Sequence, residues 1–169
     1  MEETLDREIR RAAREGYCLG LLMADLDNFK QLNDAFGHAA GDEVLRRIGR
    51  YLGASVRGDD VACRFGGEEF VVILPKAPLA DTRCRAEALR DGIKTHQFDD
   101  STGSYPAATM SVGVAAYPEH GTSAADLILA ADSAMYVAKA KGRDRVVVAS
   151  GSVGQPIEVS TASDVSTAG

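Results

Sequence analysis

Two glycines followed by two acidic residues, Gly66-Gly67-Glu68-Glu69, form the part of the chain best suited to chemistry. Glycine lets a large group approach the main chain closely, here directly beside two carboxylates. Adjacent carboxylates repel each other unless a cation lies between them, and Mg²⁺ is a hard cation that brings substrate phosphates with it. Taken alone, a solvated turn would be the better interpretation of this sequence.

A second acidic group strengthens the metal hypothesis. The apolar run at residues 17–24 predicts a buried strand, and Asp25-Leu26-Asp27 follows at its carboxyl end. If this strand lies beside the glycine turn, Asp25 and Glu68 share one metal ion. The chain then enters a helix, whose N-terminal N–H groups attract anions. Carboxylates for a metal and N–H groups for phosphates at one edge suit a nucleoside triphosphate.

Apolar periodicity predicts the elements that position these groups. Asn28 is expected to cap the second helix, and Gly66-Gly67 to link two strands in a hairpin. A polar loop containing Gly103 and Pro106 precedes the fourth strand. The predicted helices are 2–15, 28–35, 38–56, 79–95 and 122–141, and the predicted strands are 17–24, 60–65, 69–74, 108–116 and 145–149.

This order predicts an α+β fold, in which a central five-stranded, mostly antiparallel sheet is flanked by helices. Residues 1–149 are expected to form one domain, and residues 150–169, which lack periodicity, a disordered tail. The net charge of −6 argues against binding to a nucleic-acid polymer, although local cations and a metal can still hold a nucleotide. Three widely spaced cysteines indicate reduced thiols and a cytoplasmic protein.

The motifs resemble, in order and from about Leu5 to Ala149, those of the GGDEF family of diguanylate cyclases. Gly66-Gly67-Glu68-Glu69-Phe70 is similar to the family signature, with Glu in third place. The other similar stretches are Asp25-Leu26-Asp27-Asn28-Phe29-Lys30-Gln31-Leu32-Asn33-Asp34, Gly37-His38-Ala39-Ala40-Gly41-Asp42, Ser111-Val112-Gly113-Val114-Ala115, and Ala131-Asp132-Ser133-Ala134-Met135-Tyr136 with Ala138-Lys139 and Gly142-Arg143.

The resemblance implies a ferredoxin-like or palm-type nucleotidyl cyclase fold and assigns roles to individual residues. Mg²⁺ (or Mn²⁺) would be held by the carboxylates of Asp25 and Glu68 and the Leu26 carbonyl. Phosphates would be bound by N–H groups near Asn28, Phe29 and Lys30. The guanine would be bound by Asn33 and Asp42, and relatives that also accept ATP tend to lack this Asp.

Three more residues have less specific expectations. Lys139 and Arg143, spaced i, i+4, are expected to share a helix face and to meet the β- and γ-phosphates. Without the motifs, a solvated basic helix end would be preferred. His38 adjoins the base pocket in sequence, and a packing role is at least as good an interpretation as substrate contact.

The implied reaction joins two GTP molecules into cyclic di-GMP and two pyrophosphates. Because each domain holds one GTP, two copies must face each other as a homodimer. Glu68 or Glu69 would help to deprotonate the attacking 3′-OH, and the sequence does not distinguish them. Arg57 and Asp60 resemble the family's R-x-x-D product-inhibition site, although Ala88 stands where some relatives carry a further Arg.

Two alternatives remain open from the sequence. One is a GTP- or cyclic di-GMP-binding regulatory module with weak turnover. The other, a different nucleotidyl cyclase or a polymerase-like palm fragment, is disfavoured by the guanine-edge residues. Family members usually begin with a D-x-L-T-G-L-x-N-R segment and an upstream sensory domain, and this chain begins after that segment. Low activity of the chain alone is therefore expected, and membrane anchoring of the parent protein is left open.

Overall fold

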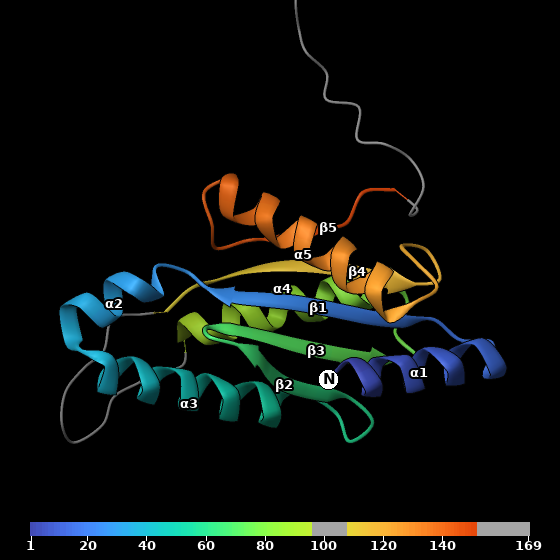
Figure 1. Cartoon of the computed structure of the whole chain (residues 1–169), viewed down its shortest axis with the longest axis horizontal. Coiled ribbons are helices and arrows are strands. Elements are labelled where there is room, and N and C mark those ends of the chain that lie inside the picture. Colours follow the sequence, from blue (N-terminus) through green and yellow to red (C-terminus); the bar gives the residue numbers. More distant parts are fainter. Residues whose placement is uncertain (96–107, 152–169) are drawn as a thin grey trace, which may run out of the picture.

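The computed structural model describes residues 1–95 and 108–151, and within them ten elements follow the predicted order (Figure 1). The predicted loop with Gly103 and Pro106, and the predicted tail from residue 152 onward, lie outside the described residues. The elements are α1 (Glu2–Glu15), β1 (Leu19–Leu26), α2 (Phe29–Phe36), α3 (His38–Ser55), β2 (Val61–Gly66), β3 (Glu69–Pro75), α4 (Leu79–Thr95), β4 (Met110–Tyr117), α5 (Ala124–Ala140) and β5 (Val146–Val148).

The five strands form one sheet in the order β2-β3-β1-β4-β5. Strand β1 is central and antiparallel to both β3 and β4, and β2 is antiparallel to β3. Only the pairing of β4 with β5 is parallel within the described part of the chain. The predicted five-stranded, mostly antiparallel sheet flanked by helices is confirmed.

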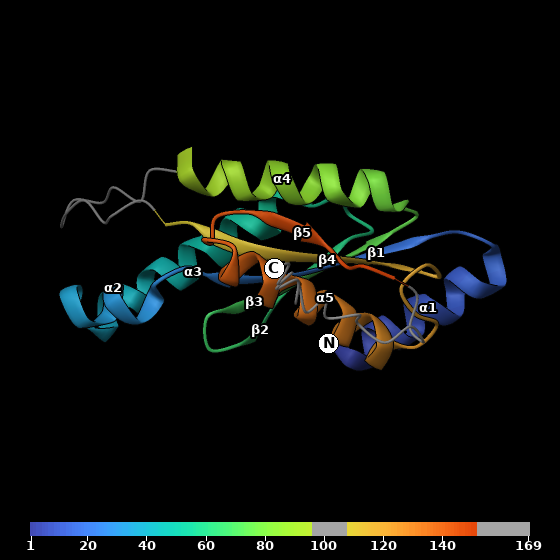
Figure 2. The same cartoon turned by 90° about the horizontal axis from the view of Figure 1, so that it is seen from above.

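Alternation along β1 divides its side chains between two cores. Leu21 and Met23 pack in one core with α1 and α5, whereas Leu22 and Ala24 pack in the other with α3 and α4. Helix α4 lies on one face of the sheet, and α1 and α5 lie on the other (Figure 2). Because side chains alternate along a strand, Asp25 is directed to the α5 face with Met23.

Helix α5 packs against β4 at Gly113, with no room for a side chain. A β-carbon added at Gly113 would overlap the carbonyl oxygen of Ala131 and the backbone nitrogen of Met135. The backbone of α5 therefore lies directly on the sheet, close to β1 and its acidic end. No helix of residues 1–95 and 108–151 combines the length and apolarity needed to span a membrane.

Candidate active site

Asp25 and Glu69 are cross-strand partners at the end of β1. The predicted strand stopped at residue 24, whereas β1 continues through Leu26, so that Asp25 lies inside the sheet with β4 on its other side. Only 5% of its surface is exposed. Burial raises the pKa of Asp25, against the opposing effect of Lys139. Burial and the neighbouring charge of Asp25 raise the pKa of Glu69 as well.

Lys139 of α5 contacts Asp25 of this pair, with its Nζ 2.8 Å from Oδ2 of that carboxylate. It was predicted at the substrate phosphates, and here its ammonium group neutralises a buried carboxylate. The charge of Arg143 also acts to lower the pKa of Asp25, which places both predicted cations within electrostatic reach of the acids. Positive charge at this end of β1 therefore favours the ionised form of these carboxylates.

The predicted metal ligand Glu68 lies beside the same strand end. The Leu26 N–H donates to the Glu68 carbonyl oxygen at 3.3 Å. Across the described ranges, no three His, Cys, Asp or Glu side chains converge into a metal site. The residues nevertheless fit a hard divalent cation, because carboxylate oxygens are its preferred ligands and the buried Asp25 with its half-buried neighbours gains from added positive charge.

The hairpin turn is displaced by one residue from its predicted place. A bulge between Arg64 and Gly66 makes Gly66 the last residue of β2, paired with Glu69, so the two linking residues are Gly67 and Glu68. The prediction of a Gly66-Gly67 link was wrong because a bulge adds one residue to a strand. Arg64 Nε donates to the Gly67 carbonyl oxygen at 2.8 Å and holds the turn. A side chain at Gly67 would meet nothing within 4 Å, so the backbone here is open to a large group.

Asp27, the second acid after the strand, has a structural role that the sequence did not indicate. Its carboxylate accepts hydrogen bonds from the hydroxyls of Thr109 at 2.8 Å and Ser111 at 2.7 Å. It also accepts the backbone N–H of Asp144 at 3.0 Å. Asp27 therefore ties β1 to β4 and to the segment that follows α5.

Helix α2 starts immediately after this acidic end. Asn28 occupies the N-cap position as predicted, but it is left-handed (φ 58°) and its side chain makes no capping hydrogen bond, so the predicted side-chain cap was wrong. Phe29 and Lys30 lie in the first turn, where backbone N–H groups have no intrahelical acceptor. This is the arrangement required for the predicted phosphate contacts.

Asn33 and Asp42, the predicted guanine ligands, lie on the paired helices α2 and α3. The Oδ1 atom of Asn33 is buried and, within the described residues, has no hydrogen-bond partner. It lies against Gly41, where a β-carbon would overlap it. An orphaned acceptor of this kind suits a ligand that donates hydrogen bonds. His38 is exposed at the start of α3.

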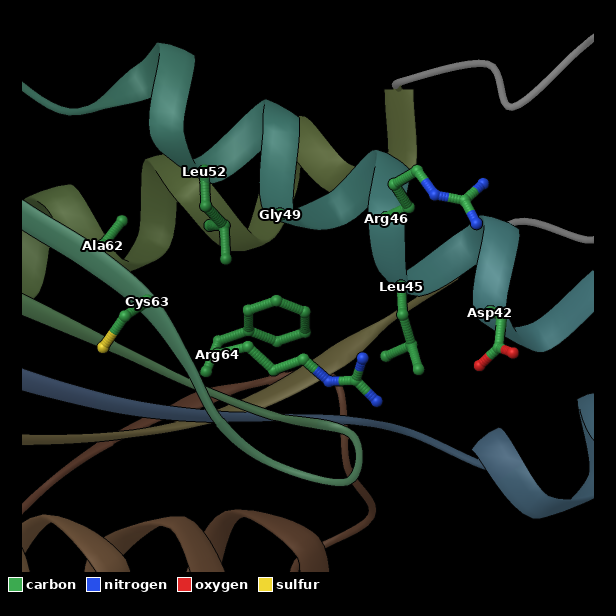
Figure 3. A pocket seen from close by; sticks show the side chains of 9 residues that line it. Asp42, Leu45, Arg46, Gly49, Leu52, Ala62, Cys63 and Arg64 are labelled. Carbon is green, nitrogen blue, oxygen red and sulfur yellow. The ribbon is translucent and has the colours of Figure 1, made fainter. Parts of the chain in front are cut away.

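Asp42 lines a pocket of about 480 Å³ between α3 and the β2–β3 hairpin. In Figure 3, Asp42 and Arg46 project from α3 on one side of this pocket, and Arg64 extends from β2 on the other. The floor is apolar and includes Leu45 and Phe70. A planar base with a polar edge fits such a lining.

The predicted helix face shared by Lys139 and Arg143 does not exist. Helix α5 ends at Ala140, and Arg143 follows in a left-handed turn, with φ values of 107° at Gly142, 63° at Arg143 and 45° at Asp144. The Arg143 N–H donates to the Ala138 carbonyl oxygen at 3.0 Å and closes the helix end. Arg143 is therefore placed by the turn after α5.

Arg57 and Asp60 line a separate pocket of about 620 Å³. Asp60 is 3% exposed at its side chain, and its Oδ2 accepts the Arg57 N–H at 2.7 Å and Nη2 of Arg85 at 2.6 Å. Arg85 lies on α4 one turn before Ala88. Sequence reasoning missed Arg85, although the three-residue spacing from Ala88 places both on one side of a helix.

The chain was compared with known families and proteins. Residues 1–145 match the model of a family described as "Diguanylate cyclase, GGDEF domain". The chain is 42% identical over 148 residues to the response regulator PleD of Caulobacter vibrioides, an alignment that covers 87% of this chain and 33% of PleD. It therefore spans about a third of the length of this curated relative.

Two solved structures share the fold. The GGDEF domain of PA1120 from Pseudomonas aeruginosa has a TM-score of 0.84 and 37% identity, covering 88% of this chain and 92% of that one. The GGDEF domain of DgcB from Caulobacter crescentus, in complex with c-di-GMP, has a TM-score of 0.80 and 31% identity, covering 86% of each chain. These matches confirm the predicted palm-type nucleotidyl cyclase fold.

Proposed function

This chain belongs to the GGDEF domain family of diguanylate cyclases, and we propose on that premise that it condenses two GTP molecules into cyclic di-GMP and two pyrophosphates. The observation that carries the proposal is the cross-strand pair of buried Asp25 and half-buried Glu69, in which Lys139 contacts Asp25, next to the start of α2 at Phe29. This end of the sheet collects acids for a cation, cations for phosphates and backbone donors.

In the proposed substrate complex, Asp25, Glu68 and the Leu26 carbonyl would hold Mg²⁺ or Mn²⁺. The ion supplies positive charge to the triphosphate of the bound GTP. Backbone N–H groups near Asn28, Phe29 and Lys30 hold phosphate oxygens, as a helix N-terminus can.

Base recognition is assigned to Asn33 and Asp42. The orphaned Oδ1 of Asn33 and the carboxylate of Asp42 are acceptors, and the guanine edge offers N–H donors that adenine lacks in the same arrangement. Lys139 and Arg143 would bind the β- and γ-phosphates. Lys139, which contacts Asp25 in this structure, would exchange that contact for one with the substrate.

The reaction forms a bond between the 3′-oxygen of one GTP and the α-phosphorus of the other, and breaks the bond from that phosphorus to the bridging oxygen of pyrophosphate. The 3′-OH proton passes to a carboxylate. Of the two candidates, Glu69 is favoured as the base, because burial raises its pKa toward the range useful for proton transfer. Lys139 and Arg143 offset the charge that develops on the leaving pyrophosphate.

The proposed working unit is a homodimer, because each copy binds one GTP and the two reacting ends must face each other. A sensory or regulatory domain of the parent protein would control that pairing. Since the substrate is GTP, the domain is expected in the cytoplasm.

We also propose that the pocket lined by Arg57, Asp60 and Arg85 binds the product and inhibits turnover. Guanidinium groups bind phosphate and guanine edges in bidentate fashion. Position 88, where some relatives carry an arginine, is alanine in this chain. Arg85 of the same helix contacts Asp60 and would supply the missing positive charge. The c-di-GMP complex of the DgcB domain supports a product-binding role in a relative.

The direct test is incubation of the purified chain, fused to a dimerising coiled coil, with GTP and Mg²⁺ or Mn²⁺. Chromatography should show cyclic di-GMP and pyrophosphate, and Glu69→Ala should abolish both while leaving the circular dichroism spectrum unchanged. If the dimerised protein binds GTP without turnover, the alternative of a GTP-binding regulatory module would replace the cyclase proposal.

A further inference from the structure

Three consecutive left-handed residues follow α5, and two of them are not glycine. Backbone of this kind is unfavourable for Arg143 and Asp144, because their β-carbons crowd the main chain. A strained segment persists only where its surroundings hold it, and such segments gather at functional sites.

Hydrogen bonds to three side chains fix the turn. The Asp144 N–H donates to Asp27 at 3.0 Å, which anchors the turn to the chain just after β1. Arg145 Nε donates to the Arg143 carbonyl oxygen at 3.0 Å. Arg90 Nη1, from α4, donates to the Asp144 carbonyl oxygen at 3.0 Å. The backbone on both sides of the Asp144 α-carbon is therefore held from outside the turn.

Helix α4 also binds the side chain of Asp144. Arg90 Nη1 lies 2.8 Å from Oδ1 and Lys94 Nζ lies 2.7 Å from Oδ2, so each carboxylate oxygen has its own cation. The side chain of Arg90 is only 15% exposed, so this contact is partly shielded from water. Two cations from one helix on one carboxylate fix both its position and its orientation.

We propose that Arg90 and Lys94 are positioning residues for the reaction, which act through Asp144 to hold Arg143 at the terminal phosphates of bound GTP. This inference rests on the proposed function, because it takes Arg143 to be a phosphate ligand. Neither α4 cation contacts the substrate in this scheme. Their effect reaches the phosphates only through the shape of the turn.

The test compares two ligands that differ at the terminal phosphates. One is 3′-deoxy-GTP, which carries the triphosphate but lacks the attacking hydroxyl, and the other is GMP. Calorimetric titration in Mg²⁺ of the wild type should show tighter binding of 3′-deoxy-GTP than of GMP. Equal affinity, or no binding, would contradict the proposed function itself, and with it any role of Arg143 at terminal phosphates.

If the wild type binds 3′-deoxy-GTP more tightly than GMP, Arg90→Gln should weaken binding of 3′-deoxy-GTP by about tenfold. It should leave the affinity for GMP within about twofold of the wild-type value. Arg143→Gln should do the same, and the double variant should lose no more than Arg143→Gln alone, because both changes remove one interaction. Equal losses for both ligands, or losses that multiply in the double variant, would overturn the inference.

Arg83→Gln is the matched control, since Arg83 is an exposed residue of α4 and loses the same charge. It should leave both affinities unchanged, and a loss equal to that of Arg90→Gln would assign the effect to general charge. Asp144→Asn is the second variant if Arg90→Gln unfolds. It keeps the side-chain shape but removes the charge, and the inference requires the same selective loss of 3′-deoxy-GTP binding.

Discussion

At the scale of residues, the acidic pair of Asp25 and Glu69 has an electrostatic cost that its contacts only partly offset. Lys139 reaches Asp25 at 2.8 Å, yet burial still raises the pKa of that carboxyl. A bound divalent ion would relieve the repulsion more completely than one ammonium group can. Without the ion, the ionised pair opposes folding, and this sets the sign of the first prediction.

In the metal-free protein, the contribution of Asp25 and Glu69 to the unfolding free energy should fall as pH rises above about 4. Because the pKa values of Asp25 and Glu69 are raised in the folded state, that state binds more protons than the unfolded state. Their stabilising contribution is fully present below the unfolded pKa and is lost as pH rises through the raised folded pKa. Denaturation in EDTA should therefore show a smaller fall for Asp25→Asn than for wild type.

Glu3→Gln on the exposed face of α1 is the control for this experiment, and it should keep the wild-type pH dependence. A fall in Asp25→Asn as large as in wild type would show that Asp25 does not carry the effect.

Asn33 allows a sharper test of base selectivity. Its buried Oδ1 has no partner in the described chain, so Asn33→Ala removes little from the folded state and should leave the melting temperature nearly unchanged. Selectivity for GTP over ATP should fall by about tenfold or more. Binding titrations with both nucleotides would measure this, with Gln31→Ala on the exposed side of α2 as control. Unchanged selectivity would mean that Asn33 does not contact the base.

Arg85 should control product inhibition. Arg85→Ala removes the cation that reaches Asp60 at 2.6 Å, so the concentration of cyclic di-GMP that halves turnover should rise by about tenfold. Initial rates at increasing cyclic di-GMP would measure it, beside Arg83→Ala from the exposed face of the same helix. Inhibition as strong as in wild type would exclude Arg85 from the product pocket.

At the scale of elements, α5 and β4 pack backbone against backbone. The backbone of α5 lies on Gly113, so the helix that carries Lys139 is placed by the absence of a side chain on the sheet. Any side chain at this position must push α5 outward. Because Lys139 contacts Asp25, such a shift would change the site as well as the core.

Gly113→Ala should therefore lower the free energy of unfolding by about 1–3 kcal/mol, as overpacked cores do. Gly53→Ala is the matched substitution of opposite sign. Its β-carbon would meet nothing within 4 Å, and alanine favours a helix over glycine by about 0.5–1 kcal/mol. Chemical denaturation would measure the free energy of unfolding of both variants. Equal stability of Gly113→Ala and wild type would contradict the packing of α5 on Gly113.

Element order and most boundaries could be predicted from the sequence, because apolar periodicity and glycines mark them. Predicted helix 79–95 coincides with α4, and the predicted hairpin exists. The turn could not be placed correctly, because a bulge in β2 depends on pairing with β3. The end of β1 could not be predicted either. Asp25 is polar, which suggested that the strand stops at residue 24, and yet it lies inside the sheet beside Lys139.

The acids at the end of β1 could be located from the sequence, since polar carboxylates follow an apolar run there, whereas the base-binding roles of Asn33 and Asp42 stay a prediction. Asp144, Arg90 and Lys94 could not be predicted together, because α4 and the turn after α5 meet only in the folded chain. Arg143 shows the same limit. Its spacing from Lys139 predicted one shared helix face. Arg143 lies instead in a left-handed turn, which depends on two hydrogen bonds: from the Arg143 N–H to the Ala138 carbonyl oxygen, and from the Asp144 N–H to the Asp27 carboxylate.

At the scale of the whole molecule, the proposed reaction needs two copies of the chain. One copy provides one set of acids at one end of one sheet, and the two reacting GTP molecules are related by symmetry. A closed pair with equivalent partners is the simplest arrangement that satisfies both. Activity should therefore depend on how often two chains meet.

The rate of cyclic di-GMP formation should rise with the square of the protein concentration while most of the protein is monomeric. Under these conditions the concentration of dimer is proportional to the square of the total protein concentration. Fusion to a dimerising coiled coil should make the rate proportional to concentration and raise it at low protein. Rates measured over a hundredfold dilution series would test this, with the Glu69→Ala fusion as blank. A rate per chain that is constant on dilution of the unfused protein would contradict the need for pairing.

The central position of β1 has a consequence for the timescales of motion. Because β1 is hydrogen-bonded to β3 on one side and β4 on the other, its backbone amides should exchange with deuterium only through the rarest openings of the domain. The outer strands β2 and β5 should exchange sooner. Asp25 thus sits on the slowest-opening strand, while Gly67 and Glu68 turn at the end of an outer hairpin. In the proposed reaction, the turn at Gly67 and Glu68 is therefore expected to adjust to an arriving nucleotide more readily than Asp25.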